Sequence, residues 1–248
     1  MRLELRTLGG LEMIAPGAEM EAAGLQPKRL ALLAYLLAAR PTGFVRRDML
    51  LALFWPDLPA RRARLALRQA LHQLRLLALP DHPIRVLGRG AVAADHDCVS
   101  CDAYAFEVEC HEGAAEAALA RYRGEFLDGV HVAGVSAEFE EWLTDRRRHY
   151  RELAVCAAWR VAGDADRAGH PDDAIAAAER ALQLAPDDEP GLRRLMLLLE
   201  ARGNRATALR HYDRFARRLA TDLFAAPSPL TRQVAERLRV EGPLATQR

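Results

Sequence analysis

Hydrophobic and polar residues alternate at the start of the chain. Leu3, Leu5, Leu11 and Met13 stand at even spacing around Gly9-Gly10. Because successive side chains of a strand point to opposite faces, this spacing predicts one or two short strands with a turn or bulge at the glycines. The next residues, 15–26, are rich in Ala, Gly and Glu, which predicts a loop.

Three segments with helical spacing follow, at residues 27–39, 46–54 and 59–77, and prolines bound each of them. The first begins at Pro27, a residue well suited to the first turn of a helix. Its apolar residues surround the helix almost completely. We therefore expect it at the centre of a small domain.

The third helix carries two different faces. Leu67, Leu71 and Leu74 fall on one side and would face the core. Five basic side chains recur at steps of three and four on another side, namely Arg61, Arg64, Arg68, His72 and Arg75. An apolar stripe opposite an arginine ridge suits a helix that is held by a domain while it enters a nucleic-acid groove. The alternative interpretation is a solvated, arginine-rich surface.

Residues 84–93 predict a β-hairpin with glycines at the turn and Arg89 at its tip. Strand, three helices and hairpin is the element order of a winged helix-turn-helix, in which the third helix reads the major groove and the hairpin forms the wing. Arg85 and Arg89 would then be the wing contacts. An ordinary connecting turn is the alternative for the hairpin.

The second half of the chain has a helical pattern rich in alanine, with helices predicted at 113–126 and 138–162. An internal repeat follows, in which Gly169 and Ala174 correspond to Gly203 and Ala208 at an offset of 34 residues. Thirty-four is the period of tetratricopeptide helix pairs, where a small Ala lets the paired helices approach each other. The sequence therefore predicts a helical-repeat domain.

Charge is distributed unevenly along the chain. Residues 1–100 contain 14 Lys and Arg against 9 Asp and Glu, or +5, and residues 101–248 contain 21 against 25, or −4. A basic first part favours a polyanion as its partner. No apolar run approaches the ~18 residues of a membrane span and the N-terminus lacks a signal-peptide pattern, so we expect a cytoplasmic protein without a membrane partner.

Metal and catalytic sites are not expected. Cys98 and Cys101 have the local spacing of two zinc ligands, but no second pair with such spacing follows, which favours simple thiols. The sequence contains no Walker loop, no Gly-x-Gly-x-x-Gly, no Gly-x-Ser-x-Gly and no His-Glu-x-x-His. We therefore expect no cofactor and no enzyme activity.

Several short motifs resemble one family along nearly the whole chain. In the first part they are Arg47-Asp48-Met49-Leu50, Leu53-Phe54-Trp55-Pro56, Ala63-Arg64 and Leu74-Arg75. In the second part they are Cys101-Asp102-Ala103-Tyr104-Ala105-Phe106, Tyr122-Arg123-Gly124-Glu125-Phe126-Leu127, Glu141-Trp142-Leu143 with Arg146-Arg147, Ala208-Leu209-Arg210-His211-Tyr212 and Pro227-Ser228-Pro229. In this order they resemble the SARP-type (AfsR/DnrI/RedD-type) bacterial transcriptional regulators. One departure is Asp222-Leu223-Phe224, where the family usually has Glu-Leu-Gly.

The resemblance implies a winged helix-turn-helix joined to a tetratricopeptide-like bacterial transcriptional activator domain, which we expect at residues 1–97 and 101–242. It also implies binding to direct repeats near promoters, association of two copies on DNA and contact with RNA polymerase. We assign Arg64, Arg68 and His72 to base edges, since arginine pairs well with guanine. Phosphate and wing contacts are assigned to Lys28, Arg61, Arg75, Arg85 and Arg89. The alternative function is a helical-repeat protein–protein adaptor that does not bind DNA.

Overall fold

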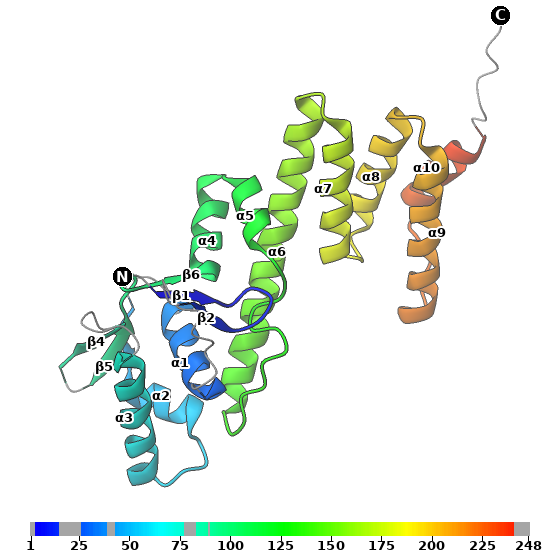
Figure 1. The fold of residues 1–248 in the computed structure, drawn as a ribbon. Helices are drawn as coiled ribbons and strands as arrows, with labels where there is room; N and C mark the ends of the chain where they lie inside the picture. The colour runs from blue at the N-terminus through cyan, green and yellow to red at the C-terminus, as the bar shows by residue number, and fades with distance from the viewer. Residues whose placement is uncertain (1–2, 15–25, 39–42, 77–82, 89, 241–248) are drawn as a thin grey trace, which may run out of the picture. The chain divides into compact units, whose positions relative to one another are not determined.

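A computed structural model describes residues 3–14, 26–38, 43–76, 83–88 and 90–240 (Figure 1). The chain divides into two compact units, residues 1–150 and 151–248. The division falls within one long helix, α6 (Ala137–Arg167). The two units are described separately below.

The first unit opens with the predicted strands. β1 (Leu3–Arg6) pairs antiparallel with β2 (Glu12–Ile14) across a turn at Gly9 and Gly10, both of which have positive φ. A third strand, β6 (Val99–Cys101), lies parallel to β1 and was not predicted. Three residues are too short a run to show strand periodicity, and the partner strand lies almost a hundred residues earlier in the sequence. The loop predicted for residues 15–26 lies, except for residue 26, outside the described residues.

The three predicted helices are confirmed within one or two residues as α1 (Pro27–Ala38), α2 (Arg47–Phe54) and α3 (Ala60–Leu76). α1 is buried along almost its whole length, from Leu30 to Leu37. The predicted hairpin is also confirmed. β4 (Ile84–Leu87) and β5 (Ala91–Ala94) pair antiparallel, and β3 (Val45–Arg46) pairs with the other edge of β5. The order of strand, three helices and hairpin is that of a winged helix-turn-helix.

The helix predicted at 113–126 is wrong in both bounds. The structure has α4 (Asp102–Glu112) and the short α5 (Ala115–Arg121), separated by Gly113 in the left-handed conformation. After α5 the chain leaves the helix because Phe126 bridges to Leu8 and Gly10, and Arg147 donates to the carbonyls of Phe126 and Leu127 at 2.9 and 2.7 Å. Such long-range contacts override the local helical pattern.

Aromatic side chains from distant parts of the sequence make up much of the core of the first unit. The ring of Tyr35 on α1 lies 4.7 Å from the ring of Trp142 on α6, and the rings of Phe54 and Phe139 lie 4.8 Å apart. The carboxylate of Asp102, at the start of α4, is also buried there. It accepts hydrogen bonds from the backbone N–H and the hydroxyl of Thr7, both at 2.7 Å, and from the N–H of Leu8 at 3.1 Å.

The second unit is entirely helical in its described part. It contains the second half of α6 and four further helices, α7 (Pro171–Leu184), α8 (Glu189–Ala201), α9 (Arg205–Asp222) and α10 (Pro229–Val240). Its core combines small and large residues, among them Ala178, Leu195, Met196 and Phe215.

The predicted repeat is confirmed as two equivalent helix–turn–helix joints. Gly169 lies between α6 and α7 and Gly203 between α8 and α9, with φ of +77° and +71°. Each glycine N–H donates to the carbonyl three residues earlier, at 3.1 and 2.8 Å. Ala174 and Ala208, one turn into the second helix of each pair, are completely buried. Equivalent residues 34 positions apart therefore share hydrogen-bond pattern and packing as well as residue type.

Candidate nucleic-acid interface

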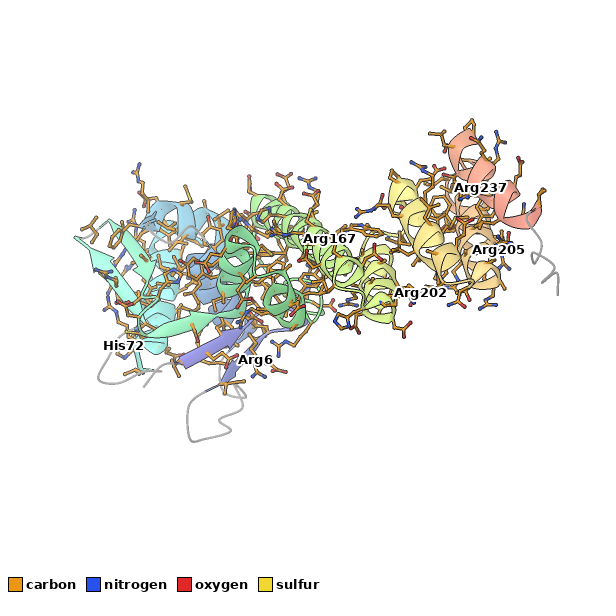
Figure 2. The ribbon with its side chains drawn as sticks, turned by 90° about the horizontal axis from the view of Figure 1, so that it is seen from above. Arg6, His72, Arg167, Arg202, Arg205 and Arg237 are labelled. Atoms are coloured by element: carbon orange, nitrogen blue, oxygen red, sulfur yellow. The ribbon has the colours of Figure 1, made fainter. Side chains whose placement is uncertain are left out.

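α3 separates apolar and basic side chains as predicted. Leu67, Leu71 and Leu74 are buried, together with Ala63 and Ala70. The basic ridge of the sequence prediction (Arg61, Arg64, Arg68, His72 and Arg75) lies on other sides of the helix, and all of it is exposed except Arg75, which is half-buried. His72 projects from α3 at the periphery of the first unit (Figure 2). The structure therefore places the five ridge residues where a ligand can reach most of them.

α3 has an excess of positive charge. The helix contains five arginines and no acidic residue. Within the described part of the chain, Arg61, Arg64 and Arg68 form no ion pair. Arg61 and Arg62 stand in the first turn, where the helix dipole favours negative charge. A polyanion at this end would relieve both the mutual repulsion of the arginines and the unfavourable dipole interaction.

Three further residues on the exposed part of α3 were not among the predicted contacts. Arg62 and Gln69 are exposed beside the ridge, and Leu65 is an apolar residue with 51% of its surface exposed. An apolar side chain can contact the methyl group of thymine, and an amide can pair with adenine. The period of the helix could have indicated these positions, because they directly flank the ridge.

The hairpin lies next to α3 (Figure 1). Arg85 on β4 is exposed, and its guanidinium lies 3.8 Å from the carboxylate of Asp95. A surface ion pair of this length contributes little energy and is readily exchanged for a phosphate. Val86 and Leu87 on the same strand are exposed as well. The predicted contact Arg89 lies outside the described residues.

Lys28 makes contacts within the chain that the sequence did not indicate. Its Nζ donates to the carbonyl of Phe54 at 2.8 Å and to that of Gly134 at 2.7 Å, and it lies over the ring of Trp55. Burial lowers the pKa of this lysine, and the charge of Asp57 opposes that effect. Because the ammonium group is occupied by these carbonyls, we leave Lys28 out of the proposed phosphate contacts.

Neither of the two cysteines of the Cys-x-x-Cys spacing, both of which are described, forms a disulfide bond. Cys101 is buried, and its Sγ lies 3.7 Å from the hydroxyl of Thr7. Burial, together with the charge of Asp102, raises its pKa to about 11. Among the described residues, no three His, Cys, Asp or Glu side chains are grouped so that they could hold a metal ion.

Comparison with known proteins identifies the second part of the chain. Residues 103–239, more than half of the chain, match the family described as Bacterial transcriptional activator domain. The chain belongs to this family. This membership agrees with the resemblance to SARP-type transcriptional regulators that the sequence motifs indicated. A comparison with curated proteins found no match.

A solved structure shares the fold. The chain resembles EmbR of Mycobacterium tuberculosis, in a complex with a low-affinity phosphopeptide, with a TM-score of 0.69 and 24% sequence identity. The similarity covers 98% of this chain but only 66% of the EmbR chain. The shared architecture thus includes both the strand-and-helix region at the N-terminus and the helical region that follows it. Within the described residues, no helix combines the length and the apolar character that crossing a membrane requires.

Proposed function

We propose that this regulator binds DNA in a sequence-specific manner through α3 and the hairpin 84–93, and that it activates transcription from promoters with direct repeats. The exposed basic ridge of α3, on a helix that has no acidic residue and is anchored by its leucines, is the observation that carries this proposal. Such a helix attracts the DNA phosphates electrostatically and can at the same time present side chains to the base edges.

Two groups of contacts are proposed on this surface. Arg64, Arg68 and His72, in the middle of the ridge, would contact base edges. Arg61, Arg75, Arg85 and Arg89 would contact phosphates and hold the register. The helical region, residues 101–242, would contact RNA polymerase or a second copy of the chain. Membership in a transcriptional activator family supports this part of the proposal.

Selection of bound fragments from random DNA, with the purified chain, tests the function and yields the target site at once. On that site, Arg68→Ala should weaken binding by about 1–3 kcal/mol and relax the preference at one base position. Arg214→Ala is a matched control, because Arg214 is an exposed arginine on α9 in the second unit. It should leave both affinity and base preference unchanged.

Two results would contradict the proposal. Unchanged binding of the Arg68→Ala protein at matched salt would remove the assignment of α3 as the reading helix. If no DNA is retained even at low salt, the adaptor function is favoured instead, because a protein that neutralises several phosphates binds most tightly at low salt.

A further inference from the structure

A hollow of about 300 Å³ lies at the C-terminal half of α3, next to the start of α2. Its described lining is basic or neutral throughout and comprises Arg47, Arg68, Gln69, Leu71, His72 and Arg75. Arg47 comes from the first turn of α2, and all the others come from α3. The two helices thus bring three arginines and one histidine to a single concave surface that no described carboxylate lines.

Arg47 has a polar atom that needs a partner. Its Nε is buried and makes no hydrogen bond within the described residues. A buried N–H without an acceptor is energetically costly, so such groups are rare in folded proteins. Its neighbour Arg46, in contrast, lies in solvent with its guanidinium 3.9 Å from the carboxylate of Asp48. Within the described residues, Arg47 therefore keeps one unpaired donor on a side chain that lines the hollow.

The backbone holds Arg47 in place at this hollow. Its N–H donates to the carbonyl of Gly90 at 2.9 Å, which ties the start of α2 to the hairpin. The preceding residue, Arg46, belongs to β3 and pairs with Ala91 of β5. The main chain at Arg47 is thus fixed from two sides before any ligand arrives, which reduces the entropy lost on binding.

We propose that this hollow binds a phosphate group, with Arg47 and Arg75 as its main cations and Gln69 as an additional donor. A tetrahedral phosphate has several acceptor oxygens, and the planar guanidinium groups of two arginines match them in bidentate geometry. Leu71 is buried and contributes an apolar wall that limits access of water from that side. Arg68 and His72 lie at the same hollow but are exposed, so their outer atoms stay free for neighbouring base edges.

The phosphate could belong to the DNA backbone or be a free phosphate ion, because both present the same oxygens. The first source rests on the DNA binding proposed above, in which the backbone runs beside the reading helix. The site then adds Arg47 to the contacts that the sequence indicated. Arg47 stands in the first turn of α2 and outside the ridge of α3, so the periodicity of α3 alone could not reveal it.

The test compares the full chain with Arg47→Ala, Arg47→Lys and the control Arg214→Ala. In the first arm, DNA affinity is measured from low to moderate salt on the selected site and on unrelated duplexes. If a backbone phosphate occupies the site, Arg47→Ala should weaken binding to all sequences alike, and the slope of log K against log salt should become shallower by about 1. Arg47→Lys should restore the slope because it keeps the charge, while affinity returns only in part because the bidentate fork is lost.

In the second arm, the same proteins are titrated with inorganic phosphate in a calorimeter. Saturable binding that Arg47→Ala abolishes and Arg214→Ala retains would identify a free phosphate as the ligand. The proposal is overturned if Arg47→Ala changes neither the salt slope nor phosphate binding while its thermal unfolding matches that of the unaltered chain. If the unaltered chain itself binds no DNA, the proposed function fails. The phosphate titration then still tests whether the hollow binds phosphate.

Discussion

Phe224, the second residue after α9, has a backbone conformation that suits glycine better than an aromatic residue. Its φ is +50°, in the left-handed region, and its side chain is 93% exposed. The next residue, Ala225, donates its N–H to the carbonyl of Leu219 at 3.1 Å, which closes the end of the helix around the left-handed residue. The SARP-type family that the sequence resembles usually has Gly after Glu-Leu at this point, and the structure gives a physical reason: the helix end has a positive φ.

Replacing Phe224 with Gly should therefore stabilise the second unit. A side chain with a Cβ costs roughly 1–2 kcal/mol in this conformation, and glycine recovers most of it, less its greater entropy in the unfolded chain. We expect the free energy of unfolding to rise by about 1 kcal/mol, measured by urea denaturation. Phe224→Ala keeps the Cβ and serves as the control, with a change near zero. A less stable Phe224→Gly protein would mean that the exposed ring stabilises the fold.

Individual site residues were predictable where one helix determines their positions. The spacing of Arg61, Arg64, Arg68 and His72 sufficed to place them together, because a period of 3.6 residues fixes which side chains share a face. The contacts of Lys28 could not be predicted in this way. Its two acceptor carbonyls come from segments 26 and 106 residues away, and no local pattern reveals such contacts.

Asp102 connects three elements of the first unit at the start of α4. Its carboxylate accepts from Thr7 and Leu8 after β1, and Arg123 donates to the same carboxylate at 3.0 Å. Only 3% of the Asp102 side chain is exposed, whereas the side chain of Arg123 is 44% exposed. The hydrogen bonds from the backbone and from Thr7 therefore contribute more than the partly solvated ion pair.

Asp102→Ala should destabilise the protein by about 3 kcal/mol, because it leaves buried donors without an acceptor. Denaturant titration followed by circular dichroism measures this change. Asp97→Ala is the control, since Asp97 is an exposed residue five positions earlier, and we expect it to stay within about 0.5 kcal/mol. A loss below 1 kcal/mol for Asp102→Ala would contradict the importance of this network.

Elements that form from local sequence were predicted well. α1, α2, α3 and the hairpin have their own periodicity, prolines and glycines, and the 34-residue repeat is visible in the order of small residues. β6 and the break between α4 and α5 were missed because their positions depend on pairing with β1 and on contacts to Leu8 and Arg147. Such pairings are decided by residues that are distant in sequence.

At the scale of the molecule, the first compact unit extends beyond the basic part of the sequence. The sequence suggests a boundary between residues 97 and 101, where the charge and the pattern change. The first compact unit nevertheless continues to residue 150. Two side chains of α6, Phe139 and Trp142, pack on Phe54 and Tyr35 in the helix-turn-helix region. The first unit is therefore assembled from residues on both sides of the expected boundary.

This arrangement predicts that a fragment of residues 1–97 will not fold stably, whereas a fragment of residues 1–150 will. The shorter fragment lacks β6, the carboxylate of Asp102 and the aromatic side chains that cover Tyr35 and Phe54. Exposing two large aromatic side chains alone costs several kcal/mol, which approaches the whole stability of a small domain. The longer fragment retains all these contacts because they lie before residue 151.

Thermal unfolding followed by circular dichroism distinguishes the two fragments. The 1–150 fragment should unfold cooperatively and, if the proposed function is correct, retain DNA binding with the steep salt dependence of the full chain. The 1–97 fragment should show no cooperative transition. Tyr35→Ala in the longer fragment is expected to lower its unfolding temperature, because Tyr35 contacts Trp142 across the expected boundary. A cooperative transition of the 1–97 fragment would show instead that the basic region folds independently and that the contacts to α4 and α6 only position it.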